Sequence, residues 1–338
     1  MCRARRWQVG AALGLAVLGA LLAAEGDGGA VADTLYATAL PNRLLQDLQS
    51  GNRRMLARGI SWVENQVPGY RELLRALPAD RLTAVPVIGF TGPPGAGKST
   101  LVDRIIGEMV SKGHKIAVLC VDPSSPFHYG ALLGDRVRMS NWFNHPSVYI
   151  RSLASRGSLG GLHARIIEIT DLLKAAGFDY ILVETVGVGQ SEVEIAGLAD
   201  TTVVVLVPEA GDEIQTMKAG LMEIADVFVV NKGDRPGADL FVRNLRRILS
   251  PDHNNGERAA EVFLTTATSG GGIDSLAATL LLSRSRDHKR KSWLLAERAY
   301  QLIVSRRMEQ VSRAGLRQKI SEALAAHDFN LYRFIENY

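Results

Sequence analysis

Cysteine is nearly absent from this sequence, since its 338 residues include only Cys2 and Cys120. Two cysteines cannot build a disulfide framework, and no CxxC pair is present to hold a metal or exchange disulfides. Cys120 stands inside the apolar run IAVLCV, where a small buried hydrophobic side chain is expected. The cysteine content therefore excludes a disulfide-stabilised secreted domain and fits a reducing compartment.

A strong charge of either sign is also lacking. The chain has 39 Lys and Arg against 35 Asp and Glu, and the net charge of +4 is too small to indicate a nucleic-acid partner. The seven histidines are scattered, and His128 and His145 have no ligand-like neighbours, which argues against metal storage. Because 46% of the residues are hydrophobic, one large domain with additions is expected.

Long hydrophobic runs are missing except at residues 9–24, which follow a basic start. This stretch, with AVA before Asp33, is typical of a secretory signal peptide or a short membrane anchor. The alternative is an extension of residues 1–34 that has no targeting role.

Apolar periodicity divides the rest of the chain into three regions. Residues 35–84 show helical spacing, with breaks at Gly51 and Pro68. Residues 85–288 alternate short apolar runs with amphipathic segments, which predicts a doubly wound, mostly parallel α/β sheet. Residues 289–338 are helical again, without strands. The predicted strands are VIGF, IAVLCV, SVYIRSL, YILVE, TTVVVLV, DVFVV and VFLTT.

A phosphate-binding loop follows the first apolar run, because GPPGAGKST at residues 92–100 matches GxxxxGK[ST]. In such a loop the backbone N–H groups and the start of the next helix face the phosphates. Lys98 is expected to reach the β and γ phosphates, and Ser99 to ligate Mg²⁺. The predicted nucleotide-binding residues here are Gly92, Pro93, Pro94, Gly95, Ala96, Gly97, Lys98, Ser99 and Thr100.

The run DVFVV ends in an NKxD pattern formed by Asn231, Lys232 and Asp234. A carboxylate there can accept both N1–H and N2–H₂ of guanine. Adenine offers no such donor pair and would leave the carboxylate unpaired. The pattern therefore predicts a guanine nucleotide. Thr266, Ala267 and Thr268 follow the last predicted strand and could offer a backbone N–H to the guanine O6, although a simple strand-to-helix turn explains them equally well.

Two acids end predicted strands beside the phosphate loop. Glu184 closes YILVE and is expected to hold Mg²⁺, directly or through a water, or to align the attacking water. Asp122 closes IAVLCV and either joins the Mg²⁺ shell or caps the following turn. Gly187 follows Glu184 at a DxxG-like spacing and is placed to sense the γ-phosphate. Val188 comes next where a water-positioning glutamine would be useful, and Gln190 stands two residues later, so slow intrinsic hydrolysis is predicted.

The motifs GPPGAGKST, VDPSSP, LLGDRVRMS, VETVGVGQSE, PEAGDEIQTMKAG and VNKGD occur in the order of the MeaB/ArgK/MMAA family of P-loop GTPases, which the sequence resembles from about residue 35 onwards. The resemblance implies a GTP-hydrolysing chaperone that protects an adenosylcobalamin-dependent methylmalonyl-CoA mutase or assists its cofactor loading. It implies Mg²⁺ with GTP, and no cobalamin bound by this chain alone. Switch I would be residues 122–140, switch II residues 184–192, and residues 289–338 a homodimerisation arm. The switch that meets the mutase would comprise Asp212, Glu213, Gln215 and Lys218.

Three features depart from the family pattern: NKGD replaces NKAD, HYG at residues 128–130 replaces a TGG-like run, and residues 1–34 have no counterpart. Because a GTPase needs GTP, we expect a cytoplasmic protein whose first 34 residues are a non-targeting extension. Two rival functions stay open. One is an ArgK-type kinase of amino-acid-binding transport proteins, against which the NKGD motif argues, and the other is a metal-delivery GTPase.

Overall fold

The computed structural model describes residues 44–122, 139–154, 162–185, 191–209, 224–249, 260–282, 288–325 and 329–336. The chain divides into two compact units, Met1–Arg286 and Asp287–Tyr338, and each is described by itself. The predicted extension of residues 1–34 lies outside the described residues.

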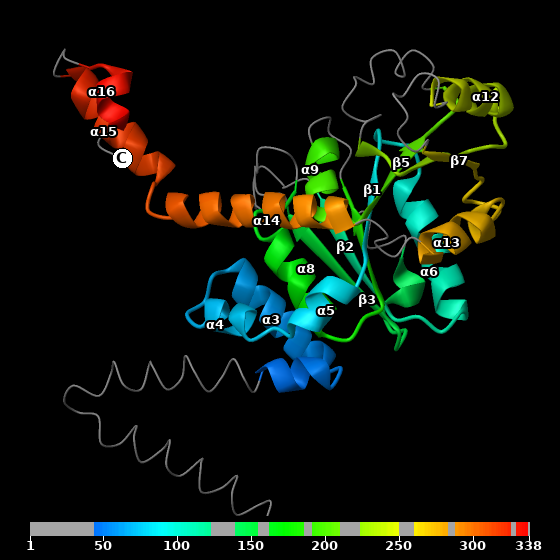
Figure 1. Cartoon of the computed structure of the whole chain (residues 1–338), viewed down its shortest axis with the longest axis horizontal. Helices are drawn as coiled ribbons and strands as arrows, with labels where there is room; N and C mark the ends of the chain where they lie inside the picture. The colour runs from blue at the N-terminus through cyan, green and yellow to red at the C-terminus, as the bar shows by residue number, and fades with distance from the viewer. Residues whose placement is uncertain are drawn as a thin grey trace, which may run out of the picture. The chain divides into compact units, whose positions relative to one another are not determined.

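The first unit contains a sheet in which all seven strands of the described residues run parallel (Figure 1). The strand order is β3-β2-β4-β1-β5-β6-β7. The central runs are rich in valine and isoleucine and are buried on both faces, as is typical of a parallel sheet, whereas β3 and β7 at its two edges are partly exposed. This confirms the predicted doubly wound α/β architecture. The strands are β1 (Val87–Thr91), β2 (Ile116–Asp122), β3 (Val148–Ala154), β4 (Tyr180–Glu184), β5 (Thr201–Leu206), β6 (Val227–Val230) and β7 (Glu261–Leu264).

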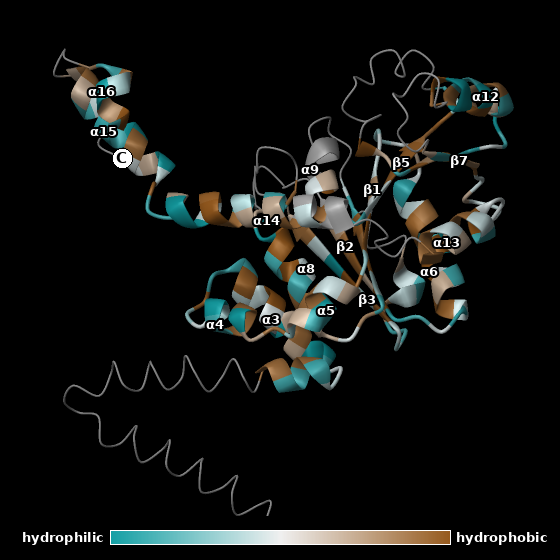
Figure 2. Cartoon of the chain, in the orientation of Figure 1, coloured by the Kyte–Doolittle hydropathy of each residue, from teal (hydrophilic) through white to brown (hydrophobic). Residues whose placement is uncertain are grey.

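Helices cover both faces of this sheet, and alternate strand residues supply the two cores. Ile88 and Phe90 of β1 pack with α6 (Lys98–Ser111) and α13 (Ile273–Leu282). Val87 points to the opposite face, which is covered by α8 (Ile166–Ala175), α9 (Ser191–Leu198) and α12 (Ala238–Ile248). Figure 2 shows the central strands as mostly hydrophobic and the outer helices as mixed, as two buried sheet faces require.

A group of N-terminal helices packs on α8 and extends the second core. Residues 44–49 are helical, followed by α3 (Arg53–Glu64), α4 (Tyr70–Arg75) and α5 (Ala79–Ala84). Ile60 and Val63 of α3 are fully buried in one cluster with Leu172 of α8. Arg81 of α5 donates to the carbonyls of Lys174 and Phe178, at 3.3 and 2.7 Å. The N-terminal helices are therefore joined to the sheet domain by both apolar and polar contacts.

Two helices were not predicted from the sequence. The predicted switch II ends at residue 192, yet residues 191–198 form α9, because Ile195 and Leu198 bury against the sheet. Helix α13 follows a run of glycines and buries Ile273, Leu276 and Leu280 at helical spacing. Both helices are short, and their few apolar residues indicate a buried helix face only when the position of the sheet is known.

The second unit consists of α14 (His288–Met308), α15 (Arg313–Ala325) and α16 (Leu331–Ile335). Among the described residues, no helix combines the length and the apolar character needed to cross a membrane. Many large apolar side chains of this unit are solvent-exposed. They include Leu295, Tyr300, Leu302, Ile303, Val304, Met308, Leu324, Leu331, Tyr332 and Ile335.

Candidate nucleotide-binding site

The phosphate loop of residues 92–97 joins the C-terminal end of β1 to the start of α6. Strand β1 lies between β4 and β5. The chain runs from β1 to β2 towards one edge of the sheet and from β4 past β1 to β5 towards the other edge. In open parallel sheets, ligands bind at the carboxyl ends of the strands beside such a reversal. Helix α6 begins at Lys98, and its N-cap residue, Gly97, supplies no side-chain hydrogen bond. The positive end of the helix dipole therefore lies at the phosphate loop, where it favours an anion.

Gly97 ends the loop and needs to be glycine for two reasons. Its φ of 87° lies in the left-handed region. A Cβ added there would also come within 2.5 Å of Nδ2 of Asn231. The glycine therefore allows the loop to approach the strand end that carries the NKGD motif.

The side chain of Lys98 folds back over the phosphate loop, and the residue is only 6% exposed. Its ammonium group donates to the carbonyl oxygens of Gly92 and Pro93, at 2.8 and 3.1 Å. Phosphate oxygens accept stronger, charge-assisted hydrogen bonds than carbonyls do, so an ammonium group held here is placed to move onto a phosphate.

Ser99 and Glu184 meet beside Lys98. The Ser99 hydroxyl donates to Oε1 of Glu184 at 2.7 Å, and the two residues are 5% and 4% exposed. Glu184 ends β4 opposite Phe90 of β1, and the next residue, Thr185, donates to the hydroxyl of Thr91 at 3.0 Å. A hydroxyl and a carboxylate that converge in a buried position are the oxygen ligands that Mg²⁺ prefers, so the pair fits that ion.

Asn231 connects three parts of the site and is 2% exposed. Its Nδ2 donates to the carbonyl oxygen of Ala96 in the phosphate loop at 2.9 Å. Its Oδ1 accepts from the Thr265 hydroxyl at 3.2 Å and from the Ala267 N–H at 3.1 Å. The phosphate loop, the end of β6 and the segment after β7 are thereby held together by one side chain.

The rest of the NKGD motif forms a tight turn after β6. Lys232 has a φ of 59°, a left-handed conformation that few non-glycine residues adopt. The Gly233 N–H donates to the Thr265 carbonyl at 2.8 Å, and Asp234 is exposed. Arg235 then forms an ion pair with Glu209, and this hydrogen bond holds the pKa of the Glu209 carboxyl below its usual value.

The segment of residues 266–268 is a turn, and most of its hydrogen-bonding groups are engaged. The Thr266 N–H donates to the Gly271 carbonyl at 2.9 Å, and the Ala267 N–H donates to Asn231. The Thr268 N–H donates to no group within the described part of the chain. Of the three N–H groups considered for the guanine O6, that of Thr268 is the one left open.

Arg104 was not singled out from the sequence, yet it contacts this turn from α6. Its Nε donates to the Ala267 carbonyl at 3.0 Å and its Nη2 to the Thr268 carbonyl at 2.8 Å. The only sequence signal for this contact is an arginine six positions after Lys98, on the helix that starts at the phosphate loop.

Several predicted site residues lie outside the described residues or have side chains that are not described. Asp122 ends β2, but its side chain is not described, and Gly187 of the predicted switch II falls in a gap. Their roles stay predictions, as do those of the predicted partner switch, Asp212, Glu213, Gln215 and Lys218. Within the described ranges no group of three or more His, Cys, Asp or Glu could hold a metal.

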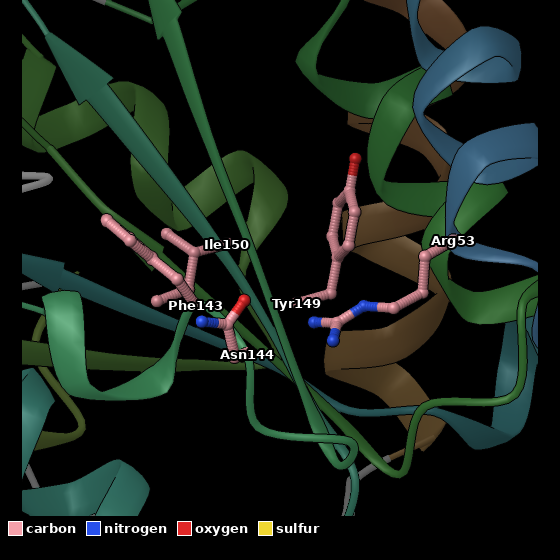
Figure 3. Close-up of a pocket in the computed structure, with 5 residues that line it drawn as sticks. All are labelled: Arg53, Phe143, Asn144, Tyr149 and Ile150. Carbon is pink, nitrogen blue, oxygen red and sulfur yellow. The ribbon is translucent and has the colours of Figure 1, made fainter.

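A separate pocket of about 500 Å³ lies at the start of β3, one of the two edge strands (Figure 3). Arg53 lies beside Tyr149, with its guanidinium 6.0 Å from the ring centroid, and Phe143, Asn144 and Ile150 complete the lining. All described strands run parallel, so they all begin at the same end of the sheet. The pocket lies at that end, whereas the phosphate loop lies at the opposite end, where the strands finish. The pocket contains no predicted site residue.

Comparison with known proteins relates most of the chain to one family. The family model described as methylmalonyl Co-A mutase-associated GTPase MeaB matches residues 56–325. A protein of Pyrococcus horikoshii whose name describes it as a GTPase is 44% identical over 264 residues, which are 76% of this chain and 81% of that protein.

Further relatives come from a bacterium and a mammal. GTPase ArgK of Escherichia coli is 40% identical over 56% of this chain and 58% of its own length. The mitochondrial methylmalonic aciduria type A homolog of Mus musculus is 40% identical over 60% of this chain and 51% of its own length. A crystal structure described as a LAO/AO transport system kinase covers 88% of this chain and 96% of its own, with a TM-score of 0.61 at 24% identity, and so shares the fold.

Proposed function

Because the chain belongs to the family of methylmalonyl Co-A mutase-associated GTPases (MeaB), we propose that it hydrolyses GTP as a chaperone of an adenosylcobalamin-dependent acyl-CoA mutase. The chaperone would protect the mutase or assist its cofactor loading. The observation that carries the GTPase part is the contact of Asn231 with the phosphate loop, since it joins a phosphate-binding element to a guanine-type NKGD motif. The mutase part rests on the family name and on the relative from mouse.

Binding of the phosphates falls to Lys98 and to the start of α6. The Lys98 ammonium exchanges its carbonyl partners for oxygens of the β and γ phosphates, which carry negative charge. The first N–H groups of α6 and the positive end of its dipole add to the same attraction. This part of the site discriminates nucleotides by phosphate and not by base.

Mg²⁺ would be held by Ser99 and Glu184, with Asp122 as the third oxygen ligand that the sequence predicts. When bound, the ion neutralises charge that develops on the transferred phosphate. Before the ion arrives, the Ser99 hydroxyl is oriented by Glu184, so the ligand set is arranged in advance. Gly187 would sense the γ-phosphate, as the sequence predicts.

The base is read by the strand ends that Asn231 connects. Asp234 accepts the N1–H and N2–H₂ of guanine, and the turn at residues 266–268 supplies the donor for O6. Because adenine presents the opposite pattern at its position 6, ATP is a poor substrate for this site. Competition between GTP and ATP therefore also separates the proposal from a kinase that uses ATP.

The proposed activity is tested by removing the phosphate-binding cation. We expect Lys98→Ala to lower the rate of GTP hydrolysis by at least about 100-fold, because the charge that holds the γ-phosphate is lost. Phosphate release from GTP measures this rate. Lys112→Ala, at the exposed C-terminal cap of the same helix, is the matched control and keeps the parent rate. Parent-like hydrolysis by the Lys98 variant would exclude this loop as the active site.

The proposal also includes an oligomeric state and a cellular compartment for the protein. Exposed apolar side chains of α14 such as Tyr300, Ile303 and Met308 support a homodimer formed through residues 289–338. A solution mass of one chain, 36.6 kDa, at micromolar concentration would contradict the dimer. Because GTP is the substrate, the proposed compartment is the cytoplasm, and export of a tagged full chain to the cell exterior would contradict it.

A further inference from the structure

We propose that Arg104 is a positioning residue that fixes the base-reading turn, so that the Thr268 N–H faces the guanine O6. The inference deepens the proposed function and rests on it. Arg104 itself touches neither the base nor the phosphates in this proposal. It acts through the two carbonyl groups to which it donates, those of Ala267 and Thr268.

The geometry of the peptide bond carries the first step. The bond between Ala267 and Thr268 is trans, so the Ala267 carbonyl and the Thr268 N–H lie in one plane and point in opposite directions. A hydrogen bond from Arg104 to that carbonyl therefore determines where the Thr268 N–H points, which is away from Arg104. The second hydrogen bond, to the Thr268 carbonyl, fixes the next peptide plane in the same way.

The other contacts of the turn carry the second step, because they leave no other donor open. The Thr266 N–H is engaged by Gly271, and the Ala267 N–H by Asn231. The Ser269 N–H donates to the Thr266 carbonyl at 3.1 Å. Thr268 alone among these residues keeps an N–H with no acceptor in the described structure, and Arg104 controls its direction.

The position of Arg104 on α6 carries the third step. Helix α6 starts at Lys98, packs against α13 and lies next to it in Figure 1. Asn231 holds the turn from the side of β6 through the Ala267 N–H, while Arg104 holds it from α6 through the carbonyls. Because an arginine guanidinium is a planar fork with fixed donor directions, it holds two neighbouring carbonyls in one orientation, whereas the donors of a lysine ammonium rotate.

The test compares nucleotides that differ at position 6 of the base. GDP and IDP both carry O6, whereas the diphosphate of 2-aminopurine riboside lacks it. We expect Arg104→Met to raise the Kd of GDP and of IDP by about 3- to 10-fold, the range for one lost hydrogen bond. The Kd of the 2-aminopurine diphosphate should change by less than about twofold, because it makes no O6 contact to lose. Arg104→Lys should fall between the parent and Arg104→Met.

Arg81→Met is the matched control, since Arg81 also donates to two backbone carbonyls but joins α5 to the region of α8. It should leave all three Kd values unchanged while lowering the melting temperature, which also reports whether each variant is folded. Equal weakening of all three nucleotides by Arg104→Met, or no weakening at all, would overturn the positioning role. A parent protein that fails to prefer GDP over ADP would instead contradict the proposed function itself.

Discussion

At the scale of single residues, Asn231 connects the phosphate loop to the segments proposed to bind the base. Its amide is buried and makes three hydrogen bonds, one to the Ala96 carbonyl and two that it accepts after β7. Buried polar groups with satisfied partners rigidify a site, and leaving one unpaired costs about 1–3 kcal/mol. The phosphate loop and the base loop are therefore not independent binding elements.

Asp234 belongs to the same loop, and its carboxylate is expected to choose the base. We predict that Asp234→Asn shifts preference from guanine to xanthine nucleotides, because an amide cannot accept from both N1–H and N2–H₂ of guanine. The loss for GTP should be about 1.5–3 kcal/mol, a factor of roughly 10 to 150 in Kd. Competition of GTP and XTP for the variant measures the shift.

The control for this substitution is Asp239→Asn. Asp239 is also exposed and lies close by, in the first turn of α12, but it is not part of the NKGD motif. It should leave the preference for GTP unchanged. An Asp234 variant that binds GTP as the parent does, and gains nothing for XTP, would refute the base-reading role.

At the scale of elements, α3 shows how a helix outside the candidate nucleotide site stabilises the unit that contains this site. The Asn52 side chain caps α3 by accepting from the N–H groups of Arg54 and Met55, each at 3.2 Å. The helix then buries Ile60 and Val63 against the core shared with α8. Its cap therefore contributes to the stability of the whole first unit.

We predict that Asn52→Ala lowers the free energy of unfolding by about 1 kcal/mol, because two N–H groups lose their acceptor. Urea denaturation measures the loss. Asn52→Asp keeps an acceptor and should retain most of the stability. GTP hydrolysis under folding conditions should be unchanged in both variants, and a Asn52→Ala protein as stable as the parent would show that the cap contributes nothing.

The sheet, and the places of the GPPGAGKST loop and of the NKGD turn in it, were predictable because their signals are local. A valine-rich run buried on both faces, or GPPGAGKST after such a run, can be recognised without knowing what surrounds it. Arg104 and the Ala267 N–H could not be assigned, because the contact of Arg104 spans 163 positions and that of Ala267 spans 36. Helix α9 was missed for a related reason, since Ile195 acquires a partner only when β1 lies beneath it.

At the scale of the whole molecule, a complete hydrolytic site would require the segments that follow β2, β4 and β5. Gly187 is followed by Val188 and not by a glutamine that could position the attacking water, so slow intrinsic hydrolysis is predicted. The segment after β5 begins next to Glu209, whose ion pair with Arg235 connects it to the end of the NKGD motif. A partner that binds this segment would thus act close to the proposed nucleotide site.

We predict that a cobalamin-dependent mutase accelerates hydrolysis by docking on the partner switch that includes Gln215 and Lys218. Partner-supplied groups such as an arginine finger can raise a GTPase rate by about 10³- to 10⁵-fold. A parent protein with slow intrinsic hydrolysis could therefore be strongly stimulated. Replacing both residues by alanine should leave intrinsic hydrolysis within about twofold of the parent and remove the stimulation. The control is Arg243→Ala, which replaces an exposed side chain on α12 and should retain stimulation by the mutase. Equal loss of intrinsic and stimulated rates would place Gln215 and Lys218 in the catalytic site, and a mutase that fails to stimulate the parent would contradict the chaperone role.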